Sequence, residues 1–121
     1  MLRTIAYWIS TGLIALSGLF AAFAYLSGGS QVVQGFAAVG YPQQLRIILG
    51  IAKPLGVIAL VIPGFVTLKE WAYAGFTFAW ICAFFAHHLA HQGPVAIEPL
   101  FLLVLLVISY LTRPASRRLG A

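Results

Sequence analysis

Four long apolar segments constrain this chain more than any other feature of its sequence. They lie near residues 5–26, 45–63, 70–90 and 96–111, with breaks at SGGS, PGFVTLK and QGP. Each approaches the roughly 20 residues that an α-helix needs to cross a hydrocarbon core. Only 7% of the 121 residues are charged, too few polar side chains to cover a soluble domain. The sequence therefore predicts an all-α integral membrane protein, with residues 1–121 forming a single transmembrane domain, an up-down bundle of four helices.

The cationic residues predict the orientation of this bundle. The run Ile5–Leu26 is longer than the core of a signal peptide, so we expect it to remain as the first helix. One predicted side of the membrane carries five cations, namely Arg3, Lys69, Arg113, Arg117 and Arg118, and the other carries Arg46. By the positive-inside rule both termini are cytoplasmic, and residues 113–121 form a short basic, frayed tail. The net charge of +5 thus marks topology and does not predict a nucleic-acid partner.

The first loop on the outer side is long and has its own apolar pattern. Val32, Val33, Phe36 and Ala37 recur at helical spacing, which predicts a short amphipathic helix lying at the membrane interface. Small residues also recur four apart along the predicted spans, at Ser17 and Ala21, at Ala52 and Gly56, and at Gly75, Ala79 and Ala83. Such stripes allow membrane helices to pack closely. They can also join copies of the chain, and we expect a homo-oligomer.

Lys53 is the strongest single indication of a site. It lies about 12 Å inside the second span at 1.5 Å per residue. Cations within the membrane usually face a bundle interior, a water-filled cavity or a counter-charge. The alternative is that the Lys53 side chain extends along the helix toward the outer surface. Pro54 follows it and leaves the carbonyl of Gly50 without its helical donor, which favours a ligand or water site.

Three histidines, His87, His88 and His91, lie close together at the outer end of the third span. On a continuous helix His91 is about 40° from His87, and Trp80 is about 20° from it, so these side chains share one face. Cys82 lies about 140° away, which argues against a cysteine–histidine nucleophile. As the chain has one cysteine, any redox role needs a cofactor or a partner.

Two interpretations of the histidines remain open at this stage. His87 and His91 have the i, i+4 spacing that can bind one metal ion, and Glu98 could add a carboxylate for zinc or ferrous iron. Haem fits less well, because no second helix offers an opposing histidine. Alternatively, the histidines only solvate the end of a helix.

A site for another kind of ligand is also consistent with these residues. The predicted outer half of the bundle brings together four kinds of polar group, from Lys53, the histidines, Arg46 and Glu98, with Trp80, Phe84 and Phe85 as aromatic walls. Such a cationic cavity suits an anion or the carbonyl of a quinone. On the inner side, Glu70 is interpreted as a residue of the helix cap, or as the partner of Arg113 or Lys69 in an exposed ion pair.

Several segments together resemble the DoxX-like family of small four-helix membrane proteins. The segments are VQGFAAVGYP, ILGIAKPLGVIALVIP with its lysine, LKEWAYAGF, a histidine late in the third helix and SYLTRP at the end of the fourth. The resemblance covers nearly the whole chain and implies a bacterial-type inner membrane protein. It also implies that Lys53 and a histidine near the end of the third helix, His88 by its position, are polar residues shared with other members of the family.

Some members of this family are described as subunits of thiosulfate:quinone oxidoreductase or as anchors for redox assemblies. The resemblance therefore implies an accessory subunit of a quinone- or sulfur-linked redox system, bound to a redox partner protein in the lipid bilayer. A small metal- or quinone-dependent oxidoreductase and a structural scaffold or assembly factor are the alternatives. The sequence assigns no catalytic residue, and among cofactors it favours quinone over metal or haem.

Overall fold

The protein is helical throughout the part that the structure, a computed structural model, describes, which is residues 1–118. Its α-helices are α1 (Leu2–Ser27), α2 (Ser30–Ala38), α3 (Gln43–Val61), α4 (Val66–Leu89) and α5 (Ile97–Leu111). Short 3₁₀ turns at Gly93–Ala96 and Ala115–Arg117 precede and follow α5. The all-α prediction is confirmed for these residues, and α2 lies where the sequence predicted a short helix.

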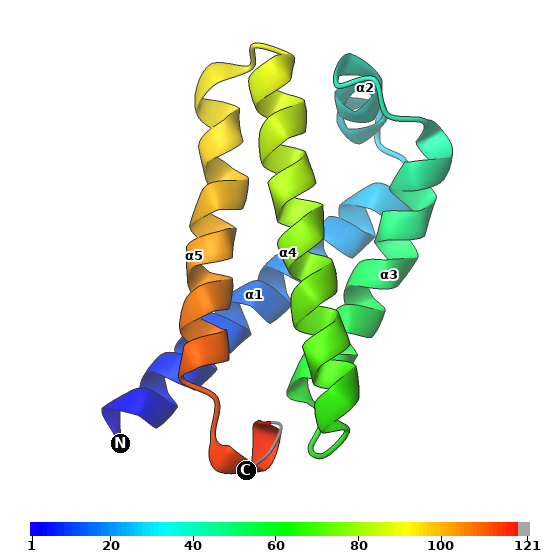
Figure 1. The fold of residues 1–121 in the computed structure, drawn as a ribbon. Helices are drawn as coiled ribbons and strands as arrows, with labels where there is room; N and C mark the ends of the chain where they lie inside the picture. The colour runs from blue at the N-terminus through cyan, green and yellow to red at the C-terminus, as the bar shows by residue number, and fades with distance from the viewer. Residues whose placement is uncertain (119–121) are drawn as a thin grey trace.

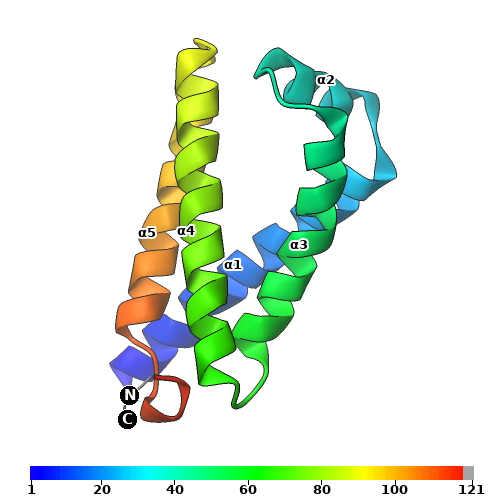
Figure 2. The same cartoon turned by 45° about the vertical axis from the view of Figure 1, so that its right-hand side comes forward.

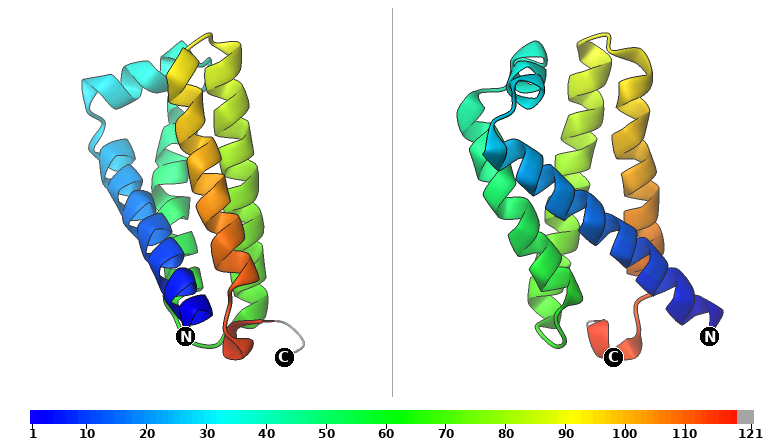
Figure 3. Two further views of the ribbon diagram at one scale, coloured as in Figure 1. Left: turned by 90° about the vertical axis from the view of Figure 1, so that its left-hand side faces the viewer. Right: turned by 180° about the vertical axis from the view of Figure 1, so that it is seen from behind.

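The four long helices alternate in direction along the molecule. Figure 1 shows α1 and α4 running from the end that holds the N-terminus toward α2, and α3 and α5 running back. We call these two ends the termini end and the α2 end. Each long helix packs against two others, because α1 contacts α3 and α5 while α4 contacts the same two. Figure 3 shows that α1 crosses obliquely, so that it begins beside α5 and finishes beside α3.

The interior of this ring is apolar and aromatic. Its buried cluster is made of Ile14, Val57, Leu60, Tyr73, Phe76, Trp80, Leu102 and Leu106. Large apolar side chains also cover the outside, where Phe20 and Phe23 are 75% and 74% exposed. An apolar surface of this extent is costly in water and is expected where lipid is the solvent.

Three helical segments are long and apolar enough to cross a membrane: Leu2–Ser27, Gln43–Val61 and Gly93–Leu111. The sequence predicted four spans, and α4 does not meet the same standard despite its 24 residues. The reason is the composition of α4. It carries Lys69 and Glu70 near its start and His87 and His88 in its last turn. Its apolar part is therefore shorter than the helix itself.

The loop helix α2 lies across the α2 end and packs on α1 and α3, as Figure 2 also shows. Phe36 is buried and its ring meets that of Tyr25 edge-on at 5.1 Å. The chain enters α2 after Gly28, whose φ of 68° ends α1 in the left-handed conformation that glycine adopts without strain. The predicted apolar face is present, although Ala37 at its edge is exposed.

Small residues allow the closest helix contacts, but only some of the predicted ones. A Cβ added at Gly18 would lie 2.8 Å from the Val57 side chain, so α1 and α3 meet there through glycine. A Cβ at Gly56 would lie 2.9 Å from the Phe76 ring, which brings α3 close to α4. In contrast, a Cβ at Gly75 would meet nothing within 4 Å. At Gly75 the predicted stripe on α4 therefore faces open space instead of a helix contact.

The contact at Gly18 can be tested by substitution. We expect Gly18→Ala to lower the free energy of unfolding by about 1–2 kcal/mol, because the new methyl group overpacks against buried Val57. The control is Gly12→Ala on the same helix, where a Cβ meets nothing within 4 Å. That change should be neutral or stabilising by up to about 1 kcal/mol, as alanine favours helix over glycine. Unfolding in mixed detergent, followed by circular dichroism, measures both, and equal effects would contradict the packing argument.

Candidate functional site

Two cations at the termini end bind the C-terminal end of α3. Lys69 is 1% exposed, and its Nζ donates hydrogen bonds to the carbonyl of Ala59 at 2.9 Å and to the carbonyl of Ile62. Arg117 donates to the carbonyl of Leu60 at 3.0 Å. The last carbonyls of a helix have no donor within it, and leaving them unpaired in an apolar environment is costly. Lys69 and Arg117 are thus structural caps as well as the topology signals inferred from the sequence.

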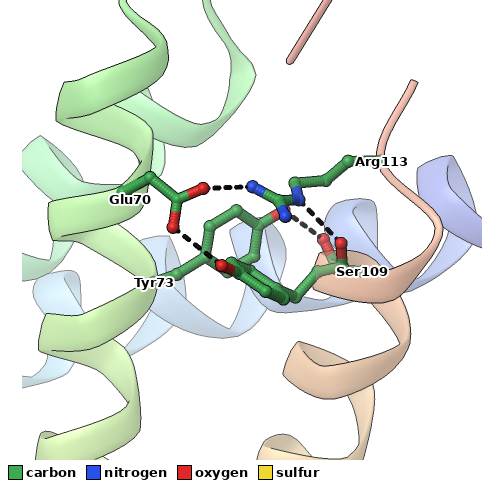
Figure 4. Close-up of polar contacts among 5 residues, drawn as sticks. Glu70, Tyr73, Ser109 and Arg113 are labelled. Carbon is green, nitrogen blue, oxygen red and sulfur yellow. Dashed lines mark hydrogen bonds and ion pairs between the residues drawn. The ribbon is translucent and has the colours of Figure 1, made fainter. Parts of the chain in front are cut away.

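A second polar group at this end joins α4 to the chain after α5. Glu70 and Arg113 form an ion pair, and the other carboxylate oxygen of Glu70 accepts from the Tyr110 hydroxyl at 2.9 Å (Figure 4). The Arg113 guanidinium also lies 3.6 Å from the centre of the Tyr110 ring. Of the two interpretations of Glu70, the pair with Arg113 is present, and its side chains are mostly buried instead of exposed.

Hydroxyl groups continue this network into the core. Ser109 is fully buried, and its Oγ lies 2.7 Å from the Tyr73 hydroxyl and 2.7 Å from Thr11 Oγ1. The three hydroxyls link α1, α4 and α5, and Figure 4 shows Tyr73 and Ser109 beside the Glu70–Arg113 pair.

The prediction of a frayed tail is wrong up to residue 118, because Arg113 and Arg117 are both anchored by hydrogen bonds to the rest of the protein. Residues 119–121 lie outside the described residues.

A cavity of about 610 Å³ opens at the α2 end, between α2, α3 and α4. Its lining includes Lys53, His87 and Trp80, so it brings together three of the predicted site residues. Apolar side chains of α2, α3 and α4 form most of the remaining wall. The volume is within the range of about 300–1,000 Å³ that is typical of small-molecule sites. We refer to this space as the outer cavity.

Lys53 is the charged group of the outer cavity. Its Nζ lies 5.0 Å from the centre of the Tyr25 ring, a cation–π contact between α3 and the end of α1. Within residues 1–118 this amine has no hydrogen-bond acceptor, unlike Lys69. An ammonium group with three donors beside an apolar cavity can therefore donate to a ligand without first breaking a bond to the protein.

The three histidines have different environments. His87 lines the outer cavity, and its Nδ1 forms a hydrogen bond with the side-chain oxygen of Gln92. His88 is exposed and its ring stacks on Phe84 at 5.6 Å. The family resemblance implied His88 as the shared position, but the histidine that lines the cavity is His87.

The helical spacing behind the metal hypothesis is not present. α4 ends at Leu89, and His91 lies in the following turn with a left-handed φ of 57°. His91 is therefore not one helical turn above His87, and the set His87, His91 and Glu98 is not brought together. No three His, Cys, Asp or Glu side chains of residues 1–118 form a group that could hold a metal ion.

Two further predicted residues do not line the outer cavity. Arg46 donates to the carbonyl of Tyr25 and, through Nε at 2.9 Å, to the side chain of Gln43. It therefore caps the end of α1, as Lys69 and Arg117 cap α3. Glu98 is exposed in the first turn of α5, where a carboxylate favours the helix dipole.

Some residues of the outer cavity escaped the sequence analysis. Tyr25 and Tyr41 were not among the predicted site residues, yet both line the cavity, and the Tyr41 hydroxyl donates to the Cys82 carbonyl at 3.4 Å. Cys82 also lines the cavity, although it lies about 140° from His87 around α4, so the cavity extends over more than one face of this helix. The apolar face of α2 was the one signal that could have placed Phe36 in this wall.

The fold and the site together define the class of protein. It is a small helical membrane protein in which a charged side chain, Lys53, borders a cavity between the helices. A comparison with protein families gives the family. The profile of the DoxX-like family matches residues 9–109, which is most of the chain, and the protein belongs to this family. Searches of curated proteins and of solved structures found no match.

Substitution of Lys69 and of Lys53 tests which of these two lysines stabilises the fold. We expect Lys69→Met to lower the free energy of unfolding by about 1–3 kcal/mol, because the buried Ala59 carbonyl loses its donor and the Ile62 carbonyl keeps only the 3.3 Å bond from Arg117. The same change at Lys53 should alter it by less than about 1 kcal/mol, since no hydrogen bond to the protein is lost. Detergent unfolding of both variants measures the difference. Equal destabilisation would show that Lys53 is also a structural residue.

Proposed function

We propose that this protein is an accessory, quinone-binding subunit of a membrane redox system. The observation that carries the proposal is the Lys53 amine, which has no acceptor among the described residues and borders an aromatic cavity of about 610 Å³. A quinone is a flat apolar ring with two carbonyl acceptors. It therefore matches a cavity with few donors and many apolar contacts.

The walls of the outer cavity support a ring-shaped ligand. Trp80 is buried and stacked on Phe76 at 5.1 Å, which holds the indole in a fixed orientation. Aromatic walls favour offset or edge contacts with another ring. Lys53 would donate to one carbonyl, and His87 adds a second polar group on the opposite helix. An anion would satisfy the lysine but would gain little from these apolar walls.

The membrane arrangement is part of the same proposal. We place all four long helices across a bacterial-type inner membrane as an up-down bundle, with both termini in the cytoplasm. Support comes from the three apolar spans, the alternating course of the helices and the length of α4. The cations Arg3, Arg113 and Arg117 at the termini end agree with the positive-inside rule. The outer cavity then lies in the half of the bundle away from the cytoplasm.

The accessory role follows from what the chain contributes to electron transfer. One cysteine, Cys82, does not form a dithiol pair within a single chain, so electrons must be exchanged with another protein or with the bound quinone itself. We therefore include a redox partner protein and a homo-oligomer in the proposal. The apolar outer surface of α1 and α5 offers area for such contacts as well as for lipid.

Binding of a defined probe tests the proposed site. The probe is a decyl-substituted benzoquinone, added to the full-length protein in nanodiscs and quantified by extraction after washing. We expect Lys53→Met to weaken binding at least about tenfold, since a hydrogen bond from a charged donor is lost. His87→Gln should weaken it several-fold.

His88→Gln is the matched control, because this neighbouring histidine does not line the outer cavity. It should bind the probe as the native protein does. Undiminished binding by Lys53→Met would overturn the quinone site and favour a scaffold role. Equal losses in the His87 and His88 variants would indicate a general effect of the helix end.

A further inference from the structure

A second cavity, of about 310 Å³, runs along the α3–α4 interface toward the termini end. Its walls come from these two helices alone, and Leu55 and Trp71 form part of the lining. We call it the α3–α4 groove. Both Leu55 and Trp71 are largely exposed at the outer surface of the helices, so the groove borders the region that lipid would occupy.

The groove and the outer cavity adjoin each other. Leu49, Lys53 and Ala79 line both of them. Lys53 therefore stands at the junction, with an aromatic space on one side and an apolar groove on the other. The lining along α4 extends from His87 in the outer cavity to Leu68 in the groove, roughly 28 Å at 1.5 Å per residue. That distance is close to the roughly 30 Å thickness of a hydrocarbon core.

Small side chains on both helices create the groove. Ala52 and Ala59 contribute from α3, and Ala72, Gly75 and Ala79 from α4. At Gly75 a Cβ would meet nothing within 4 Å, so the absent side chain leaves space that the protein does not fill. Gly75 is exposed, so this space lies at the outer surface of the helices, where another apolar molecule must fill it.

We propose that the α3–α4 groove holds the linear apolar chain of the ligand whose ring lies in the outer cavity. The ligand class is then a membrane amphiphile, a ring with carbonyl acceptors that carries a long alkyl or prenyl chain. This inference rests on the proposed function. Its support is the shared lining at Lys53, because a chain attached to a ring beside that amine has a direct path into the groove.

The dimensions of the groove agree with such a chain. From Ala79 to Leu68 the lining of α4 spans roughly 16 Å. An extended chain of about ten carbons is of the same order of length. A longer prenyl chain would leave the groove beside Leu68 and Trp71 and continue into lipid.

Substitution of Gly75 tests the groove apart from the ring site. In nanodiscs, the affinity of the decyl-substituted benzoquinone is compared with that of the same benzoquinone without its chain. We expect Gly75→Leu to weaken binding of the chain-bearing probe about tenfold, because the leucine occupies the space of several methylene groups. Binding of the chainless probe should stay within twofold. Ala52→Leu, on the facing helix, should act in the same way and serves if Gly75→Leu does not fold.

Gly12→Leu is the control for a bulky residue at an open helical glycine, since Gly12 also has nothing within 4 Å of an added Cβ and lies outside both cavities. It should bind both probes as the native protein does. If Lys53→Met loses the chain-bearing probe but Gly75→Leu and Ala52→Leu retain it, the groove proposal is overturned while the ring site stands. If no variant loses it, both proposals fail.

Two other occupants of the groove give distinct results in the same experiment. A bilayer lipid chain in the groove predicts that Gly75→Leu changes neither probe's affinity. A helix of a second copy predicts that Gly75→Leu changes the oligomeric state measured by native mass spectrometry, again with unchanged binding. Either result overturns the proposal.

Discussion

The end of α3 is held by hydrogen-bond donors that come from outside the helix, on Lys69 and Arg117. A helix that stops inside or near hydrocarbon leaves carbonyls without donors, and these must be satisfied by the protein itself. Lys69 and Arg117 reach the last turn of α3 from α4 and from the segment after α5. The end of α3, the start of α4 and the segment after α5 are thereby fixed to one another. The Glu70–Arg113 pair and the Tyr73–Ser109–Thr11 hydroxyls extend the same connection to α1 and α5.

Lys53 has the opposite character, although both lysines lie on helices of the same bundle. Lys69 gives two of its donors to the backbone, while Lys53 makes a cation–π contact with Tyr25 and no hydrogen bond within residues 1–118. A cation in an apolar environment is costly unless it is paired. Within the described residues two hydrogen bonds offset this cost at Lys69, and none does so at Lys53. This difference is why we assign function to one lysine and structure to the other.

The sequence predicted the helices well because apolar length is a local property. Its predicted ranges match α1, α3, α4 and α5, and the pattern at Val32, Val33 and Phe36 predicted α2. It also predicted that Lys53, Trp80 and His87 share one site, since their depth in the helices could be counted along the chain.

The errors arose where tertiary contacts decide. Helical spacing was extended to His91, but α4 ends at Leu89 and His91 adopts a left-handed conformation, so the i, i+4 spacing does not apply to it. Arg46 and Arg117 were interpreted by charge, yet their hydrogen bonds are to backbone carbonyls that no sequence pattern reveals. From the sequence, Gly75 was predicted to pack against another helix. Small side chains occur both at close helix contacts and along open grooves, so the sequence alone does not distinguish the two.

The space beside Gly75 also bears on how such a protein can diverge. At Gly18 and Gly56 any side chain would collide with a neighbouring helix, so these positions are fixed by the fold. At Gly75 an added Cβ meets nothing within 4 Å, so we expect a larger residue there to cost the fold little. Selection can therefore alter the width of the groove one residue at a time while the helices stay in place. Descendants of one bundle could come to accept partners of different bulk without an intermediate that fails to fold.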